Sequence, residues 1–299
     1  MSVPQRLVPP STLAQLANLE LVARTVVEGA LTGLHRSPRF GFSQEFAEYR
    51  PYVPGDDLRF IDWNVFARSD RMYVKRFFGD TNTRVVVLVD VSASMGIDPA
   101  RGAIRKIDFA RYLAAAVVYL AARQHDAVGL AAFADDVRVY RPPSARGRSA
   151  EGIYHLLEGL EPAGETDWPR VLDHVSRQVT KRSLLVMISD FFCEPEPLAS
   201  RLRGLGARGH DLLLLHLLDP NEERLPVAGS ATLRDVETGA VMTVAGDEVA
   251  GGYRLRLAEH LRALEHATGS AGGHYRLMNT DRPLDRALVE YLRFRERHP

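Results

Sequence analysis

Apolar and polar positions separate a regular region, which starts near residue 84, from irregular segments before it and within it. Continuous apolar runs, typical of buried strands, occur at residues 85–89, 127–133, 184–189 and 212–218, with shorter strand patterns at 137–140 and 274–278. Apolar positions at helical spacing occur at residues 107–123, 148–160, 168–180, 198–205, 253–267 and 284–295. These repeated units predict an α/β fold with a doubly wound, mainly parallel sheet and helices on both faces.

The segment before residue 40 carries one helical pattern. Apolar residues recur there at three- and four-residue steps after a capping Ser11, namely Leu13, Leu16, Ala23, Val27, Ala30 and Leu34. We expect a long amino-terminal helix with one apolar face. That face either docks on the body of the protein or binds a partner.

Two segments interrupt the regular alternation with Pro, Gly and short polar and apolar pieces. Residues 40–78 mix aromatic and charged side chains with prolines, and two short strands flank the turn Glu237-Thr-Gly239 further along. We expect these segments to join into one small β subdomain. The sequence thus predicts an amino-terminal helix at 1–39, a β subdomain at 40–83 with 225–250, and an α/β domain at 84–224 with 251–299.

Composition removes several classes of protein from consideration. Lys plus Arg equals Asp plus Glu at 38 each, so the charge balance gives no reason to expect a nucleic-acid or anionic-membrane partner. The single Cys193 can form neither an internal disulfide nor a cysteine zinc site. No stretch has the form of a signal peptide or of a membrane span, and we expect a cytoplasmic protein.

The candidate chemistry lies where the first buried strand ends. Asp90, Ser92 and Ser94 alternate directly after the run 85–89, and Thr166 and Asp190 stand in comparable places downstream. Each could serve singly as a turn or capping residue. Together they offer hard oxygen ligands at the carboxyl edge of a sheet, which suits Mg2+, with Mn2+ or Ca2+ as alternatives.

Enzyme motifs are largely missing from the sequence. It contains no phosphate-binding loop ending in Gly-Lys-Ser/Thr and no Gly-x-Ser-x-Gly elbow. A metal-dependent phosphohydrolase of the haloacid dehalogenase type could use Asp90 as nucleophile, but Ser92 stands where that chemistry needs a second acid. A purely structural cation is the other alternative.

A metal held mostly by hydroxyl groups keeps uncompensated positive charge. If Ser92, Ser94 and Thr166 bind the ion directly, it would attract a carboxylate from outside the chain. We therefore expect a non-enzymatic adaptor whose bound cation has one position open for an acidic residue of a partner protein.

The same five residues resemble a known site. Asp90-Val-Ser-Ala-Ser94 with Thr166 and Asp190 is similar to the metal-ion-dependent adhesion site of von Willebrand factor A-type domains, over roughly residues 84–299 apart from the hairpin. The segment from Glu48 to Trp63 resembles the signature of the bacterial domain-of-unknown-function family 58. These resemblances imply a von Willebrand A-like, Rossmann-like fold. They also imply a MoxR-type AAA+ ATPase as companion in protein maturation or complex assembly.

The residues that carry the second resemblance have two interpretations. The box contains Tyr49, Arg50, Gly55, Asp56, Asp57, Arg59, Asp62 and Trp63. Opposite charges among aromatic rings often form an internal ion-pair network, whereas surfaces rich in Tyr, Trp and Arg often bind proteins. The sequence supports both interpretations equally.

Overall fold

The computed structural model describes residues 9–14, 16, 18–34, 46–54, 56, 61–77, 83–146, 149–226, 229–237, 239–284, 288–289 and 291–292. Within this part of the chain a six-stranded sheet forms the centre, in the order β10-β7-β6-β3-β4-β5. Its strands are β3 (Arg84–Asp90), β4 (Ala127–Phe133), β5 (Val137–Ser144), β6 (Leu184–Ser189), β7 (Asp211–Leu218) and β10 (His274–Asn279). Only the edge strand β5 is antiparallel to its neighbour.

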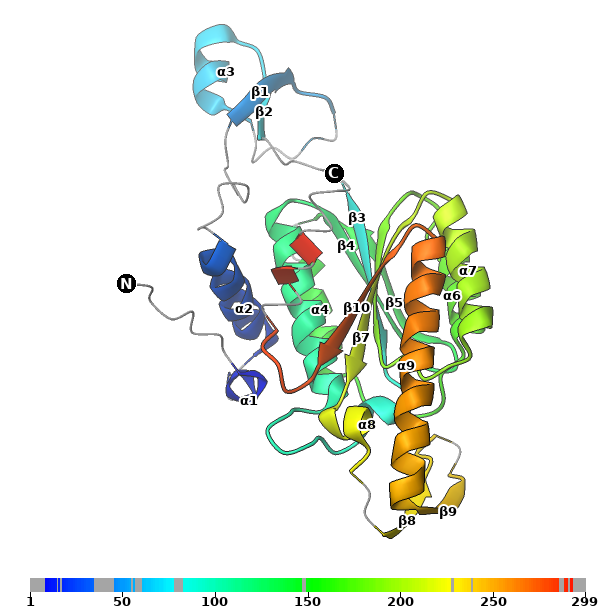
Figure 1. Cartoon of the computed structure of the whole chain (residues 1–299). Coiled ribbons are helices and arrows are strands. Elements are labelled where there is room, and N and C mark those ends of the chain that lie inside the picture. The colour runs from blue at the N-terminus through cyan, green and yellow to red at the C-terminus, as the bar shows by residue number, and fades with distance from the viewer. Residues whose placement is uncertain are drawn as a thin grey trace.

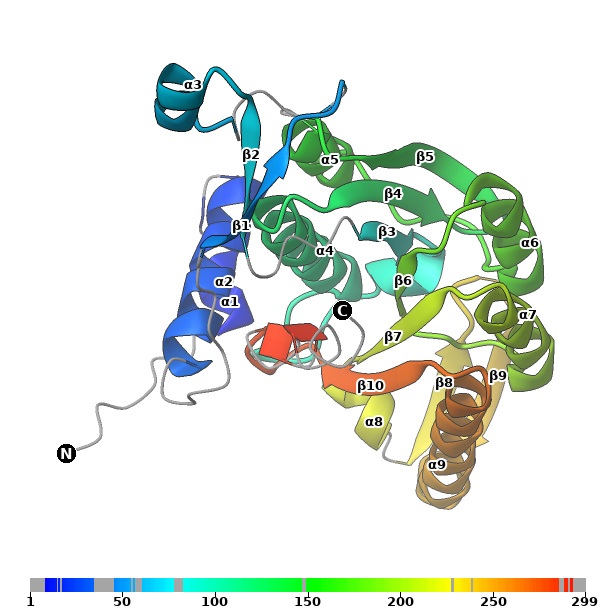
Figure 2. The ribbon, with the colours of Figure 1, turned by 90° about the horizontal axis from the view of Figure 1, so that it is seen from above.

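Helices cover both faces of this sheet (Figure 2). Side chains alternate along β3, so that Val85, Val87 and Val89 join one core cluster while Val86 and Leu88 join the other. The first cluster includes side chains of α2 (Leu19–Leu34), α4 (Lys106–Arg123) and α5 (Ser149–Glu158). The second includes α6 (Trp168–Gln178), α7 (Pro195–Ala207) and α9 (Gly246–Ser270). The predicted doubly wound α/β fold is therefore confirmed.

The amino-terminal helical pattern docks on the body of the protein. Its residues form two helices, α1 (Pro10–Leu13) and α2, where the spacing predicted one. Val22, Val26 and Val27 of α2 are buried, and α2 packs against α4. The apolar face is thus part of the core. Among the described residues, no helix combines the length and the apolar character needed to cross a membrane.

Two small hairpins lie outside the central sheet. One contains β1 (Phe46–Pro51) and β2 (Tyr73–Phe77), with α3 (Trp63–Ser69) between them in sequence, and the other contains β8 (Ser230–Arg234) and β9 (Val241–Ala245). They form separate sheets at opposite ends of the central sheet (Figure 1). The expectation that they join into one subdomain is therefore wrong.

Topology explains this separation. The first hairpin precedes β3 and lies toward the amino edge of the parallel strands, whereas the second follows β7 and leaves from the carboxyl edge. The second hairpin runs directly into α9, which begins at Gly246 instead of the predicted Tyr253. Gly251 and Gly252 lie inside this long helix, although glycine lowers helix propensity.

The direction of winding reverses at the centre of the sheet. From β3 the chain moves to β4 on one side, and it later returns to β6 on the other side of β3. In open α/β sheets, ligands bind beyond the carboxyl ends of the strands where the order of winding reverses. Asp90 ends β3 and Asp190 follows β6, so both candidate carboxylates stand at this point.

Candidate metal centre

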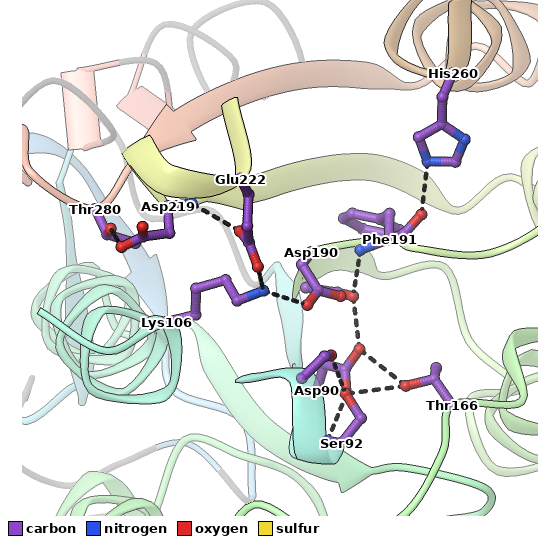
Figure 3. Close-up of polar contacts among 12 residues, drawn as sticks. Asp90, Ser92, Lys106, Thr166, Asp190, Phe191, Asp219, Glu222, His260 and Thr280 are labelled. Carbon is purple, nitrogen blue, oxygen red and sulfur yellow. Dashed lines mark hydrogen bonds and ion pairs between the residues drawn. The ribbon is translucent and has the colours of Figure 1, made fainter. Parts of the chain in front are cut away.

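Asp90 occupies the middle of the candidate centre and is completely buried. One oxygen, Oδ1, accepts a hydrogen bond from the Ser92 N–H at 2.8 Å, and Oδ2 accepts one from the Ser189 hydroxyl at 2.6 Å (Figure 3). The chain then turns into the short 3-10 helix η2 (Ala93–Gly96). This turn brings the hydroxyl oxygens of Ser92 and Ser94 within 3.0 Å of each other.

Thr166 reaches the same carboxylate from a separate loop. Its Oγ1 lies 3.3 Å from each oxygen of Asp90. The loop is held against the Asp90 turn because the Gly164 carbonyl accepts the Ala93 N–H at 2.8 Å. Gly164 has a φ of 78°, a left-handed conformation that a glycine adopts without strain. This backbone contact fixes the distance between the two loops.

Asp190 completes the cluster from the end of β6. Its carboxylate interacts electrostatically with Asp90, and the nearby Ser94 hydroxyl helps to lower its pKa. The structure therefore brings all five predicted residues together, although Thr166 and Asp190 are distant from the Asp90 loop in sequence. Sheet geometry produces this convergence, because β3 and β6 are adjacent parallel strands.

The residue after Asp190 has a strained backbone. Phe191 has a φ of 45°, which is uncommon for a residue with a side chain. Its N–H donates to the Ser189 hydroxyl at 2.8 Å, its carbonyl lies 2.9 Å from the His260 ring nitrogen Nε2, and its ring stacks on Trp168 with centroids 4.8 Å apart. These contacts hold the turn in a conformation that costs energy, a frequent property of functional sites.

A buried lysine beside Asp190 was not found by sequence reasoning. The Lys106 ammonium, in the first turn of α4, lies 2.7 Å from Asp190 Oδ2 and also forms an ion pair with Glu222 (Figure 3). Glu222 belongs to α8 (Pro220–Arg224), where its side chain accepts the Asp219 N–H in a capping box. A lysine in the first turn of a helix opposes the helix dipole, and this was the available signal.

The two central carboxylates have opposite electrostatic environments. Burial, followed by the negative charge of Asp190, raises the pKa of Asp90 to about 7. Burial also acts to raise the pKa of Asp190, but the Lys106 ammonium outweighs it and lowers that pKa below its usual value. The Lys106 ammonium thus contacts Asp190, whereas the contacts of Asp90 within the described part of the chain come from hydroxyl and N–H donors.

A second missed residue comes from the β8–β9 hairpin. The hydroxyls of Ser92 and Ser94 and the Ser94 N–H lie near enough to the Glu237 carboxylate to act against a rise in its pKa. Burial raises its pKa in spite of these donors. The expectation of an open position for an acidic residue of a partner stays a prediction.

The donor set fits a small hard cation. Among the described residues no group of three or more His, Cys, Asp or Glu side chains could hold a metal ion, so any such site must use hydroxyl oxygens. The five candidate groups are two carboxylates and three hydroxyls, the oxygen donors that Mg2+ prefers. Among the described residues, the carboxylates of Asp90, Asp190 and Glu222 are grouped around the Lys106 ammonium, and a divalent ion would reduce this negative excess.

The box that precedes β3 is in part internally satisfied. Arg50 forms an ion pair with Asp56 at 2.7 Å, and the Tyr49 hydroxyl donates to Asp62 Oδ2 at 2.8 Å. The other oxygen of Asp62 caps α3 by accepting two backbone N–H groups. Trp63 is 56% exposed. The other members of the box lie outside the described residues, namely Gly55, Asp57 and Arg59.

The doubly wound sheet with the Asp-x-Ser-x-Ser loop at its switch point is similar to the fold of von Willebrand A-type domains. The chain belongs to the DUF58 family, described as a protein of unknown function, whose model matches residues 48–264. This match includes the box, β3, the loop that carries Thr166 and the end of β6 at Asp190. The resemblance to this family in the sequence is therefore confirmed.

Relatives of similar length occur in mycobacteria. The chain is 30% identical over 295 residues to the uncharacterized protein Rv1480 of Mycobacterium tuberculosis, covering 96% of this chain and 91% of the relative. The uncharacterized protein Mb1516 of Mycobacterium bovis matches with the same identity and coverage.

Solved structures similar to this chain include two of distant sequence. The conserved hypothetical protein BatB from Bacteroides thetaiotaomicron matches with a TM-score of 0.49 at 16% identity, covering 72% of this chain and 99% of that chain. The von Willebrand A domain of SpRpn10 matches with a TM-score of 0.42 at 10% identity, covering 70% and 94%.

Proposed function

We propose that this protein is a non-enzymatic adaptor that binds an acidic residue of a partner protein through a divalent cation. Asp90, Ser92, Ser94, Thr166 and Asp190 would hold the ion, which would supply the positive charge that attracts the partner's carboxylate. The observation that carries this proposal is the convergence of these groups at the switch point of the sheet.

Charge at the site favours this function over a site without metal. Asp90 is buried beside Asp190, and the Lys106 ammonium contacts Asp190 and Glu222. A buried carboxylate whose charge has no cationic partner is costly. A divalent ion beside Asp90 would reduce this cost, and an added carboxylate would be held by direct coordination to the ion.

The alternative enzymatic function has less support from the residues. A phosphohydrolase would use Asp90 as nucleophile and would need a tuned acid and base within hydrogen-bond reach of the reacting group. Ser92 occupies the position two residues after Asp90, and a hydroxyl does not transfer protons in this way near neutral pH. Turnover of an aryl phosphate that is abolished in Asp90→Asn would support this alternative and contradict the adaptor.

The resemblance to von Willebrand A-type proteins of the DUF58 family supports a more specific partner. We propose a MoxR-type AAA+ ATPase as companion, in maturation or assembly of other proteins. This part of the proposal depends on kinship alone. ATPase recovered with the tagged chain from its native host would support it.

A pull-down with the full chain tests metal-dependent capture. We expect partners to be retained in Mg2+ and released by EDTA, and Asp90→Ala to lose them at every Mg2+ concentration. Asp98→Ala is the matched control, because Asp98 is an exposed carboxylate on the same loop. Equal retention by Asp90→Ala and by the parent chain in EDTA would contradict the proposal. Circular dichroism of each variant establishes that the fold is retained.

A further inference from the structure

The unit formed by β1, α3 and β2 lies toward the amino ends of the parallel strands, whereas the candidate metal centre lies at their carboxyl ends (Figure 1). Backbone hydrogen bonds fix both ends of α3 in this unit. Asp62, which precedes α3, donates its N–H to the Tyr73 carbonyl of β2 at 3.0 Å. Asp70, which follows α3, donates its N–H to the Phe66 carbonyl at 2.8 Å. The orientation of α3 on the hairpin is therefore set by ordered structure.

α3 carries an apolar face that stays exposed. Trp63, Phe66 and Ala67 stand at positions i, i+3 and i+4, the spacing with which a surface helix normally packs against a core. None of the seven residues of α3 is buried. Trp63 is 56% exposed, although its ring meets the ring of Phe66 edge to face with centroids 6.1 Å apart. By contrast, Val22 and Val27 of α2 are each 1% exposed. The face of α3 is therefore unpartnered within the described part of the chain.

Three more large apolar side chains of this unit are exposed. Tyr49, Val53 and Met72 have exposures of 41%, 52% and 42%. The backbone brings Val53 and Met72 close together, because the Tyr52 N–H donates to the Met72 carbonyl at 3.0 Å. Exposed apolar side chains that gather in one part of a surface mark interaction sites, and Trp, Tyr and Met are enriched in protein interfaces. Together with the face of α3, they indicate a protein-binding surface.

The charges around this surface are mostly positive. Residues 63–77 contain four basic residues and one acidic residue, namely Arg68, Arg71, Lys75 and Arg76, with Asp70. Arg68 and Arg71 are exposed. The acidic side chains that precede α3 in the described part of the unit are already engaged, since Asp56 is paired with Arg50 and Asp62 caps α3. Charge complementarity therefore favours an acidic partner.

We infer that the exposed face of α3 binds an acidic amphipathic helix of a partner protein. A helix fits this face because side chains at i, i+3 and i+4 form ridges that pack into the grooves of a second helix. Apolar side chains of the partner would cover Trp63, and acidic side chains on its flanks would pair with Arg68 and Arg71. This surface needs no cation, so the inference does not depend on the proposed function. The chain would then have two independent binding surfaces at opposite ends of its sheet.

Two matched synthetic peptides test the inference with the full chain in EDTA. Both are amphipathic helices with leucine at three- and four-residue spacing, and the remaining positions carry glutamate in one peptide and lysine in the other. We expect the parent chain to bind the glutamate peptide at least tenfold more tightly than the lysine peptide, measured by fluorescence anisotropy. This preference should shrink as the ionic strength rises from about 0.05 M to about 0.5 M, because salt screens exposed charges.

Two variants locate the peptide on the molecule. Trp63→Ser should weaken binding of the glutamate peptide at least tenfold, and Arg68→Glu should reduce the preference for the glutamate peptide. Leu255→Ser and Arg256→Glu are the matched controls, because both side chains are exposed on α9, and these variants should bind as the parent chain does. All four side chains are exposed, so we expect each variant to keep the fold, which circular dichroism checks.

Several outcomes would overturn the inference. One is the absence of binding of the glutamate peptide, or equal binding of the two peptides, and another is an equal loss of binding in Trp63→Ser and Leu255→Ser. A dimer of the parent chain that Trp63→Ser dissociates would assign the face of α3 to a second copy instead. Tighter binding of a single-stranded oligonucleotide than of the glutamate peptide would assign it to nucleic acid. Peptide binding that requires Mg2+ and is lost in Asp90→Ala would overturn the inference and support the proposed function.

Discussion

The candidate centre has two halves that are built alike and charged differently. Each half has a buried carboxylate at the end of a central strand, Asp90 after β3 and Asp190 after β6. The Asp190 half contains Lys106, which also contacts Glu222. The Asp90 half contains hydroxyls and N–H groups, which stabilise a carboxylate without neutralising it. The comparison shows that the deficit of positive charge is local.

This difference indicates what each half contributes. In a buried ion pair with good hydrogen bonds each charge is balanced by its partner, and removing one partner leaves an unpaired buried charge. The Asp190 half is therefore a structural unit that joins α4, β6 and α8. The Asp90 half has oxygen atoms grouped around a charge with no cationic side chain, which is the condition that favours a bound divalent ion.

The largest effect is expected from breaking the structural half. Lys106→Met keeps the length of the side chain and removes its charge, which leaves Asp190 and Glu222 facing each other in a buried setting. We expect a loss of about 3–5 kcal/mol in the free energy of unfolding. Urea denaturation followed by circular dichroism measures it.

A neighbouring residue provides the control for this variant. Arg105 forms an ion pair with Asp108 at 2.9 Å, but its side chain is 45% exposed. Exposed pairs contribute about 0–1 kcal/mol, so Arg105→Met should have a small effect. If the two variants lose equal stability, the buried triad is not the structural unit described above.

The second-largest effect on stability is expected from Mg2+ binding at the Asp90 half of the centre. With Mg2+ at 100 times its dissociation constant, ligand linkage predicts a gain of about 2.7 kcal/mol in the free energy of unfolding. Asp90→Ala should abolish this gain, and Asp98→Ala should retain it. Thermal or urea unfolding with and without EDTA measures the difference. A gain of the same size in Asp90→Ala would place the ion elsewhere.

Part of this arrangement could be predicted from the sequence, and the rest could not be predicted for physical reasons. Asp90, Ser92 and Ser94 are neighbours in the chain, and Thr166 and Asp190 follow from the rule that parallel strands end at one edge. Lys106 meets Asp190 and Glu222 across 84 and 116 residues, and only packing determines which side chains fill that space. Local patterns carry no such information.

The prediction that the two hairpins form one subdomain failed for a related physical reason. The segments around Tyr49 and Glu237 are both rich in turns, but a similar composition does not bring two segments together in space. The edge of the sheet from which each segment leaves was the better guide, because strand direction fixes it. The same reasoning, applied to the sequence, would have placed Glu237 near Asp90.

A third and smaller effect, the pH dependence of the free energy of unfolding, distinguishes Asp90 from Asp190. The folded pKa of Asp90, about 7, lies above the usual value of about 3.9, so the metal-free protein binds an extra proton between these values. The free energy of unfolding should therefore fall as the pH rises from 4 through 7. Asp90→Asn should flatten this slope and stabilise the metal-free protein at pH 8 by about 1 kcal/mol or more.

Urea denaturation in EDTA at a series of pH values checks this prediction. Asp98→Asn is the control, because it removes an exposed carboxylate from the same loop. A slope that persists in Asp90→Asn would show that another group takes up the proton, and the contrast between the halves would then be incorrectly assigned.

The smallest effect uses Cys193 as a probe, since it is the single cysteine of the chain. Burial, followed by the charges of Asp190 and Asp90, raises the pKa of its thiol to about 12. Because the thiolate is the reactive form, alkylation at pH 8 should be much slower than for a free cysteine, whose pKa is about 8.5.

An ion at the Asp90 half would offset the contribution of the two carboxylates to this pKa and would leave the larger contribution of burial unchanged. We therefore expect Mg2+ to accelerate alkylation by iodoacetamide, followed by mass spectrometry, by less than about tenfold, which is less than one unit of pKa. Asp90→Ala should react at the same rate with and without Mg2+. A rate in the parent chain that does not respond to Mg2+, under conditions where unfolding shows that the ion binds, would mean that the bound charge lies too far from Asp190 to act on both halves.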